Sequence, residues 1–151
     1  MLTTSERGSA LVLMPVAALI FVILGALALD ATVVFMAERE LAGAAAAAAN
    51  DAVTRGIDRD EFYRSGCVVV LPGAAVDVAR SSVAAKELER TGLSMAAPEV
   101  DVRGGSAVTV TLRGTAPHVF TRAVPGAPSD AGVSATATAT AMTAEGVDAG
   151  C

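Results

Sequence analysis

The feature that most constrains this chain is an uncharged block of twenty residues near its start, at positions 10–29. Leu, Val, Ile and Ala dominate this apolar block, which lies between Arg7 and Asp30. A helix rises about 1.5 Å per residue, so the block spans about 30 Å, the thickness of the hydrocarbon core of a bilayer. A soluble helix of this length would carry a polar stripe, and the block has none. The sequence therefore predicts a transmembrane helix at 10–29.

The charges on either side of the apolar block indicate its orientation. Arg7 and the free amine precede the block, whereas acidic residues, beginning with Asp30, predominate after it. Positive charge favours the cytoplasmic side, so we expect a cytoplasmic N-terminus at 1–9 and an extracytoplasmic remainder. The alternative is a cleaved signal peptide, because Ala26-Leu27-Ala28 fits the small-x-small rule and a cut there releases the chain from Leu29. The length of the block and the helical pattern beyond the cut favour the anchor.

The helical pattern continues past the apolar block as an extracytoplasmic extension at 30–56. This stretch contains no proline, and its alanine run at 44–49 has the highest helix propensity available. Asp51 and Arg55 form an i,i+4 pair in the favourable order, and Gly56 is a natural stop. The sequence thus predicts one rod about 65 to 70 Å long. We expect it to begin near Pro15, with a kink at this proline as the alternative.

Small residues give this rod a face for lateral contact. Gly25, Gly43 and Ala47 allow helix backbones to approach closely, as small residues four apart do in membrane helices. They predict packing against other helices. The alternative is that the alanines accommodate the protein's own sheet, and the two interpretations are compatible.

Hydrophobic periodicity divides the rest of the chain into a helix and a small sheet. The predicted elements are a buried strand at 67–71, a helix at 74–91, a hairpin at 99–113 around Gly104-Gly105, a loop or edge connection at 115–130, and a last strand at 133–142. The last strand alternates alanines on one face with hydroxyls on the other. An all-alanine face requires a closely packed neighbour, and the alanine-rich helix is the candidate.

These elements predict an α+β fold: a long N-terminal transmembrane helix that continues into a small pilin-like domain, made of a second helix and an antiparallel sheet of three to four strands. The small α+β domain is expected to cover 57–143. A mobile tail is expected at 144–151.

The charged and nucleophilic residues do not form a pattern that indicates catalysis. The net charge of −5 and the lack of a Lys/Arg run argue against a nucleic-acid partner. His118 is the only histidine, which excludes a His-based metal cluster, and in a loop it is expected to be solvated. Asp58, Asp60 and Glu61 alternate with arginines, as in a mutually neutralised surface, with a calcium site as the alternative. We therefore expect no catalytic, cofactor or metal residue, no small-molecule substrate, and a non-enzymatic role.

The two cysteines, Cys67 and Cys151, both follow the apolar block. An oxidising compartment would permit a disulfide between them. The alternative is a buried Cys67, inert among its valine neighbours, and a free terminal Cys151.

Several segments resemble TadE/TadG-like proteins of Tad (Flp) type IVb pilus assembly. The resemblance is carried by Arg7-Gly8-Ser9-Ala10, the apolar run with Pro15, Leu27-Ala28-Leu29-Asp30, the alanine-rich stretch at 40–52 and the closing strand at 133–138. It implies a minor pilin or pseudopilin in the bacterial inner membrane, single-pass, with a cytoplasmic N-terminus. The implied partners are other Tad/Flp pilus or secretion-machine subunits, contacted through helix packing, and the lipid bilayer.

The resemblance also implies a processing site. By analogy with pseudopilins of this group, a prepilin peptidase would cut after Gly8 and leave Leu13 at the fifth mature position, where those proteins carry a glutamate. This difference favours a TadG-like or retained anchored component over a polymerising pilin. The alternative function is an anchored or secreted extracytoplasmic binding module for a cell-envelope ligand, which would use the threonine face of the sheet or the 115–130 loop.

Overall fold

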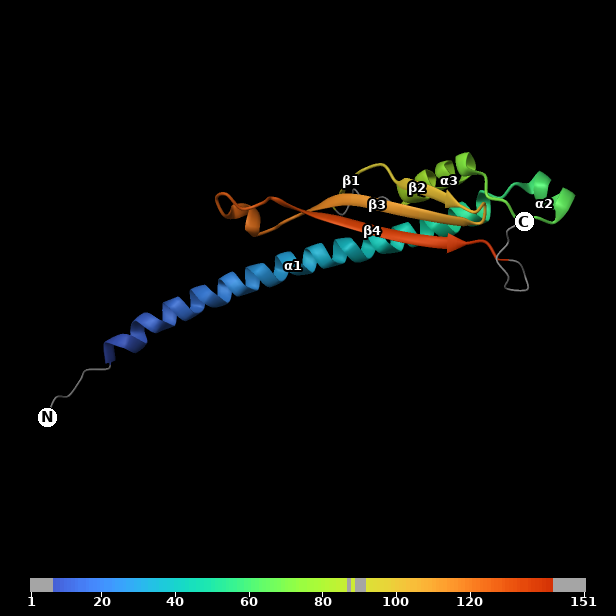
Figure 1. Ribbon diagram of the computed structural model, residues 1–151. Helices are drawn as coiled ribbons and strands as arrows, with labels where there is room; N and C mark the ends of the chain where they lie inside the picture. The colour runs from blue at the N-terminus through green and yellow to red at the C-terminus, as the bar shows by residue number, and fades with distance from the viewer. Residues whose placement is uncertain (1–6, 87, 89–91, 143–151) are drawn as a thin grey trace.

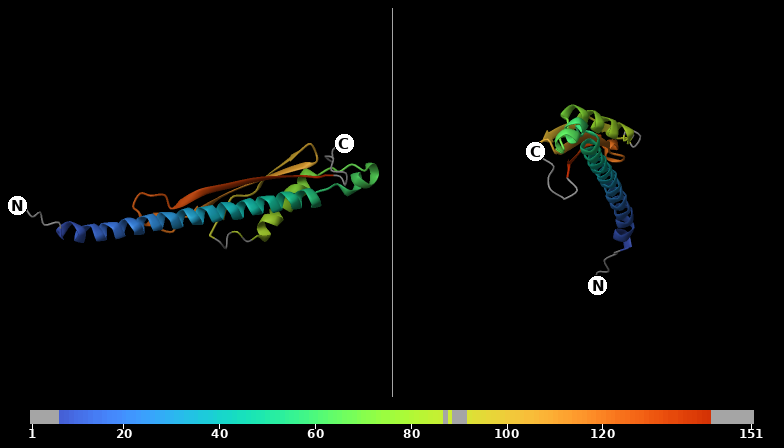
Figure 2. Two further views of the ribbon diagram at one scale, coloured as in Figure 1. Left: turned by 90° about the horizontal axis from the view of Figure 1, so that it is seen from below. Right: turned by 90° about the vertical axis from the view of Figure 1, so that its right-hand side faces the viewer.

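The computed structural model, described for residues 7–86, 88 and 92–142, consists of one long helix with a small sheet packed along its C-terminal half (Figure 1). The elements are α1 (Arg7–Arg55), α2 (Arg59–Ser65), α3 (Pro72–Ala85), β1 (Ser94–Met95), β2 (Glu99–Arg103), β3 (Ala107–Pro117), the 3-10 helix η2 (Thr121–Ala123) and β4 (Asp130–Thr140). The N-terminal half of α1 projects beyond the sheet in all views (Figures 1 and 2). The predicted α+β class and antiparallel sheet are confirmed, whereas the tail at 144–151 lies outside the described residues.

Helix α1 is continuous over 49 residues. The expectation that it begins near Pro15 is wrong, because α1 begins at Arg7 and Pro15 lies inside it. The predicted stop at Gly56 is confirmed: the Gly56 amide donates to the Ala52 carbonyl at 2.9 Å, and a Cβ at Gly56 would lie 2.4 Å from that oxygen. Only glycine therefore fits where α1 ends. The expected Asp51–Arg55 pair is present at 3.0 Å.

Strand β3 is the centre of a four-stranded antiparallel sheet. It pairs along its whole length with β4, from Ala107↔Thr140 to Pro117↔Asp130, while β2 and the short β1 pair with it on the other side. The predicted hairpin is confirmed, and both of its glycines have positive φ, 60° at Gly104 and 69° at Gly105. Because β3 runs to Pro117 and β4 begins at Asp130, the predicted 115–130 loop narrows to 118–129. We call 118–129 the β3–β4 connection.

The core lies between the alanine-rich half of α1, helix α3 and one face of the sheet. Six alanines of α1 are buried there, and alternate alanines of β4 pack against the same cluster: Ala37, Ala44, Ala45, Ala48, Ala49, Ala52, Ala135, Ala137 and Ala139. The opposite residues of β4 are exposed, as the period of two predicts. Small side chains on both surfaces let the helix and the strand approach closely, which confirms the predicted partner of the alanine face.

The segment between α1 and β1 differs from the prediction. Residues 67–71 form no strand, because their polar groups bond to turns: the Val70 amide donates to Gly105 and the Leu71 amide to Gly56. Only an isolated bridge joins Val70 to Ile57. The preceding stretch holds α2. Helix α3 runs over Pro72–Ala85 instead of 74–91, since a proline suits the first helical position.

Candidate functional site: the junction of the apolar block and the sheet

The apolar block is exposed in the structure. Large apolar side chains are exposed along α1 from position 13 to position 29, with Phe21 exposed at 76%. The sheet does not cover this part of the helix (Figure 2). By length and composition, α1 is able to cross a membrane. An apolar surface of this size on a soluble protein indicates contact with lipid or with another protein.

Asp30, directly after the apolar block, is buried, with only 3% of its surface exposed. Its carboxylate accepts four hydrogen bonds from the β3–β4 connection. Oδ1 accepts from the amides of Val119 at 2.7 Å and Phe120 at 3.0 Å, and Oδ2 accepts from the amide and the hydroxyl of Thr121 at 2.7 and 2.5 Å. Three consecutive amides thus enclose one carboxylate from α1, some 90 residues earlier in the chain.

These hydrogen bonds favour the charged form of Asp30. The hydroxyl of Thr121, and then the amides of Phe120, Thr121 and Val119, hold the pKa of Asp30 well below its usual range, although burial acts in the opposite direction. The carboxylate is therefore ionised at neutral pH. It serves as the acceptor for amides that would otherwise have no partner, and it fixes the connection to α1. We call this set of contacts the Asp30 clasp.

His118 lies beside the Asp30 clasp. The expectation that it is solvated is wrong: its side chain is 18% exposed, and Nδ1 lies 4.0 Å from Oδ2 of Asp30. The reason is that the extra residues of β3 carry His118 inward, where its amide donates to the Ser129 carbonyl at 2.9 Å. Among the described residues, its Nδ1 has no hydrogen-bond partner.

The β3–β4 connection also touches the apolar block itself. Side chains of both segments line one shallow apolar hollow: Ile23, Ala26, Leu27, Phe120, Thr121 and Val124. Both figures of the whole chain place the connection alongside α1, on the side toward the N-terminus (Figures 1 and 2). The end of the sheet is thus level with the last two turns of the apolar block.

The residues predicted for helix packing face open space or lie near the surface. Gly25 and Gly43 have no atom within 4 Å of where a Cβ would stand, and Ala47 is half-buried. Gly25 and Gly43 are five helical turns apart and so lie on one face of α1. The space beside these two glycines is open, and packing against another helix stays a prediction. Gly8, the predicted processing site, lies in the first turn of α1.

Cys67 is half-buried and disulfide-bonded. Cys151 lies outside the described residues, so the predicted pairing of the two stays a prediction. A thiol assay on folded, unreduced protein is expected to detect no reactive thiol, and one after reduction is expected to detect two, the number of cysteines in the chain. Two reactive thiols before reduction would contradict the pairing.

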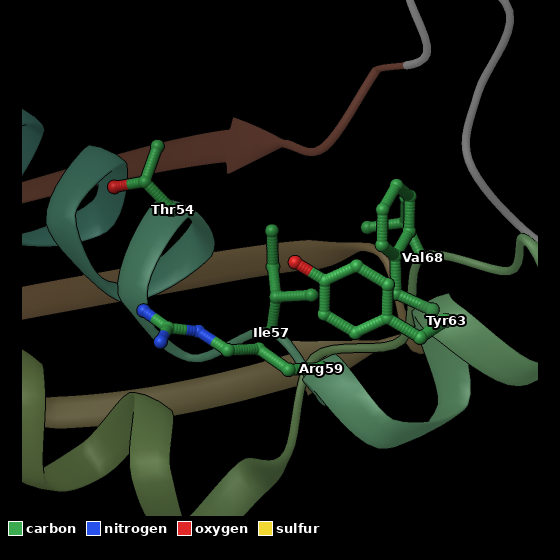
Figure 3. Close-up of a pocket in the computed structure, with 6 residues that line it drawn as sticks. Thr54, Ile57, Arg59, Tyr63 and Val68 are labelled. Carbon is green, nitrogen blue, oxygen red and sulfur yellow. The ribbon is translucent and has the colours of Figure 1, made fainter.

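A second hollow lies at the opposite end of the domain, where α1 gives way to α2 (Figure 3). It is lined by Thr54, Ile57, Arg59, Phe62, Tyr63 and Val68. The nearby acidic residues have structural partners: Asp58 accepts from the amides of Asp60 and Glu61 and caps α2, and Glu61 pairs with Arg64. In the described part of the chain, no three His, Cys, Asp or Glu side chains gather as metal ligands would.

Comparisons with known protein families, with curated proteins and with solved structures gave no match.

Proposed function

We propose that this chain is a non-enzymatic, membrane-anchored structural subunit of a Tad/Flp pilus or a related secretion apparatus. It lies in the bacterial inner membrane with its N-terminus in the cytoplasm and its sheet outside. The observation that carries the proposal is the continuity of α1, whose exposed apolar half leads without interruption into the buried alanine core of the sheet. Its role is assembly, through lateral contacts of α1 in and above the membrane.

Two contacts support a rigid coupling between anchor and sheet. The first is the alanine packing of α1 against β4 and α3. The second is the Asp30 clasp, which fixes the far end of the sheet at the boundary of the apolar block. A carboxylate held by four hydrogen bonds is suited to a structural task, because its lone pairs are already occupied.

The surface of α1 above the clasp supports lateral contacts. Phe35 and Met36 are more than half exposed, and Gly43, two turns later, leaves room for a neighbouring backbone. A helix face that combines exposed large apolar side chains with a glycine gap is typical of a surface covered by another helix.

The anchor is tested by alkaline carbonate extraction of membranes from the producing bacterium. We expect the full-length chain to stay in the membrane pellet, since a span of this length and hydropathy resists extraction. A soluble product that begins at Leu29 would show that the apolar block is a cleaved signal peptide, and the proposal would fail.

The assembly role is tested by photocrosslinking in the same bacterium. A photoreactive amino acid at Gly43 is expected to give adducts with other membrane subunits. Position 38 is the matched control, because Glu38 is also exposed and lies about 140° around the helix from Gly43. Equal labelling at both positions, or none at either in an intact membrane, would contradict lateral packing through this face.

The alternative, a binding module for a cell-envelope ligand, has one observation in its favour. Threonine hydroxyls form two rows on the exposed face of β3 and β4, where Thr109 bonds Thr138 at 2.9 Å and Thr111 bonds Thr136 at 3.1 Å. Protection of these strands from hydrogen exchange by purified cell-wall fragments, without subunit adducts at Gly43, would favour this alternative.

A further inference from the structure

We propose that the β3–β4 connection is a second membrane contact, seated in the headgroup layer of the same bilayer that α1 crosses. Its apolar side chains would point toward the hydrocarbon and Arg122 toward lipid phosphate. The proposal rests on the membrane anchoring of α1 proposed above, and it adds a lipid-binding surface that the apolar block alone does not provide.

The position of the connection is fixed relative to the apolar block. Phe120 and Val124 share the shallow hollow with Ile23 and Leu27, which lie seven and three residues before Asp30. At about 1.5 Å per residue, Ile23 stands about 10 Å on the membrane side of Asp30. If α1 spans the bilayer, the connection therefore meets the outer leaflet.

The side chains of the connection suit this depth. Val119 and Phe120 are each 45% exposed and Val124 is 57% exposed, although they lie in a connection between two strands, where polar residues are usual. Arg122 is exposed between them, and the connection contains no acidic residue. Apolar side chains beside a cation match an interface in which acyl chains lie below anionic phosphates.

The backbone of the connection is also suited to a region poor in water. Seven of its amides donate to acceptors within the protein: those of His118, Val119, Phe120, Thr121, Ala123, Val124 and Ala127. Pro125 and Pro128 have no N–H to satisfy. An irregular segment near hydrocarbon is tolerated only when its polar groups have internal partners, and the Asp30 clasp provides three of these.

The same surface favours lipid over a second copy of the chain. At the level of the connection, Leu24 and Leu29 of α1 are also more than half exposed. The apolar surface thus surrounds the helix and continues onto the connection. A single docked copy would cover one side of this surface, whereas lipid covers all of it.

The chain contains no tryptophan, so a single introduced tryptophan reports its own surroundings. We would replace Phe120 by tryptophan and, separately, Val124, so that one variant remains if the other misfolds. Each full-length variant is reconstituted into vesicles of phosphatidylcholine and phosphatidylglycerol that carry bromine either near the headgroup end or near the methyl end of the acyl chains. Tyr63→Trp is the matched control, because Tyr63 is 83% exposed at the opposite end of the domain.

We expect brominated lipid to quench Phe120→Trp and Val124→Trp, more strongly with bromine near the headgroups, and to leave Tyr63→Trp unchanged. Leu19→Trp, inside the apolar block, reports the anchor independently. Quenching of Leu19→Trp without quenching at positions 120 and 124 would overturn the second contact and leave the anchor standing. If those two positions are shielded from acrylamide but unquenched by lipid, a second copy of the chain covers them and the proposal is wrong. Absence of quenching at Leu19→Trp would refute the anchor itself.

Discussion

Replacement of Asp30 by alanine is expected to release the β3–β4 connection from α1 while the alanine core stays folded. The substitution removes every acceptor of the Asp30 clasp, so the amides of Val119, Phe120 and Thr121 lose their partners. Local opening of the connection then no longer has to break these hydrogen bonds, so the free energy of opening falls. The hydrogen exchange of the three amides should therefore accelerate about 100-fold. The exchange of β3 and β4 amides at the other end of the sheet should change little.

Asp130→Ala is the matched control for this experiment. Asp130 lies at the start of β4, next to the same connection, but it is exposed, and among the described contacts its carboxylate accepts a hydrogen bond only from the Ser129 hydroxyl. We expect its removal to leave the exchange of residues 119–121 unchanged. If Asp30→Ala also leaves these amides protected, the clasp does not hold the connection.

The clasp should also give the connection a defined dependence on pH. The pKa of Asp30 is lowered in the folded chain, so its stabilising effect is fully present above the ordinary carboxyl pKa of about 3.9 and is lost as the pH falls below that value. Protection of residues 119–121 should therefore be constant from neutral pH down to about pH 5 and decrease in stronger acid. Asp30→Asn, which cannot be charged, should remove this dependence.

Ala48→Leu is expected to lower the free energy of unfolding substantially. Ala48 is fully buried in the alanine cluster of α1, where the neighbouring surfaces leave no room for three further carbon atoms. Overpacking of this kind costs about 1 to 3 kcal/mol of unfolding free energy. Urea denaturation in detergent micelles, monitored by the hydrogen exchange of β3 and β4, measures this loss of unfolding free energy. The measurement does not depend on the anchor.

Ala46→Leu is the control, since Ala46 is exposed on the same helix two residues earlier. Its effect on the unfolding free energy should stay within about 0.5 kcal/mol. Equal destabilisation by the two variants would mean that helix propensity, and not close packing, determines the stability of this region.

Local periodicity was sufficient to predict most of the fold. The alanine run, the paired glycines of the hairpin and the alternation of β4 each determine their own backbone conformation, and the partner of the alanine face follows from side-chain volume. The strand predicted at 67–71 was wrong for a non-local reason. Its β-branched residues suit a strand, but the Val70 amide bonds to the hairpin turn at Gly105.

The junction was the part that the sequence did not predict. In the sequence, Asp30 marks the charged boundary of the apolar block, and a carboxylate after an uncharged run usually faces water. Its acceptor role depends on amides about 90 residues away, and a backbone amide leaves no signal in a sequence. Likewise, no residue close to His118 in the sequence indicates that β3 extends far enough to place His118 beside Asp30.

Because α1 is continuous, a tilt of its apolar half also tilts the half that carries the sheet. From Asp30 to Arg55 the helix extends about 37 Å, and transmembrane helices commonly lean by about 20° from the bilayer normal. A lean of this size moves Arg55 and the attached α2 sideways by about 13 Å relative to an upright helix. If the apolar block spans the bilayer as proposed, a small change in its tilt therefore produces a large displacement of α2 at the other end of the molecule.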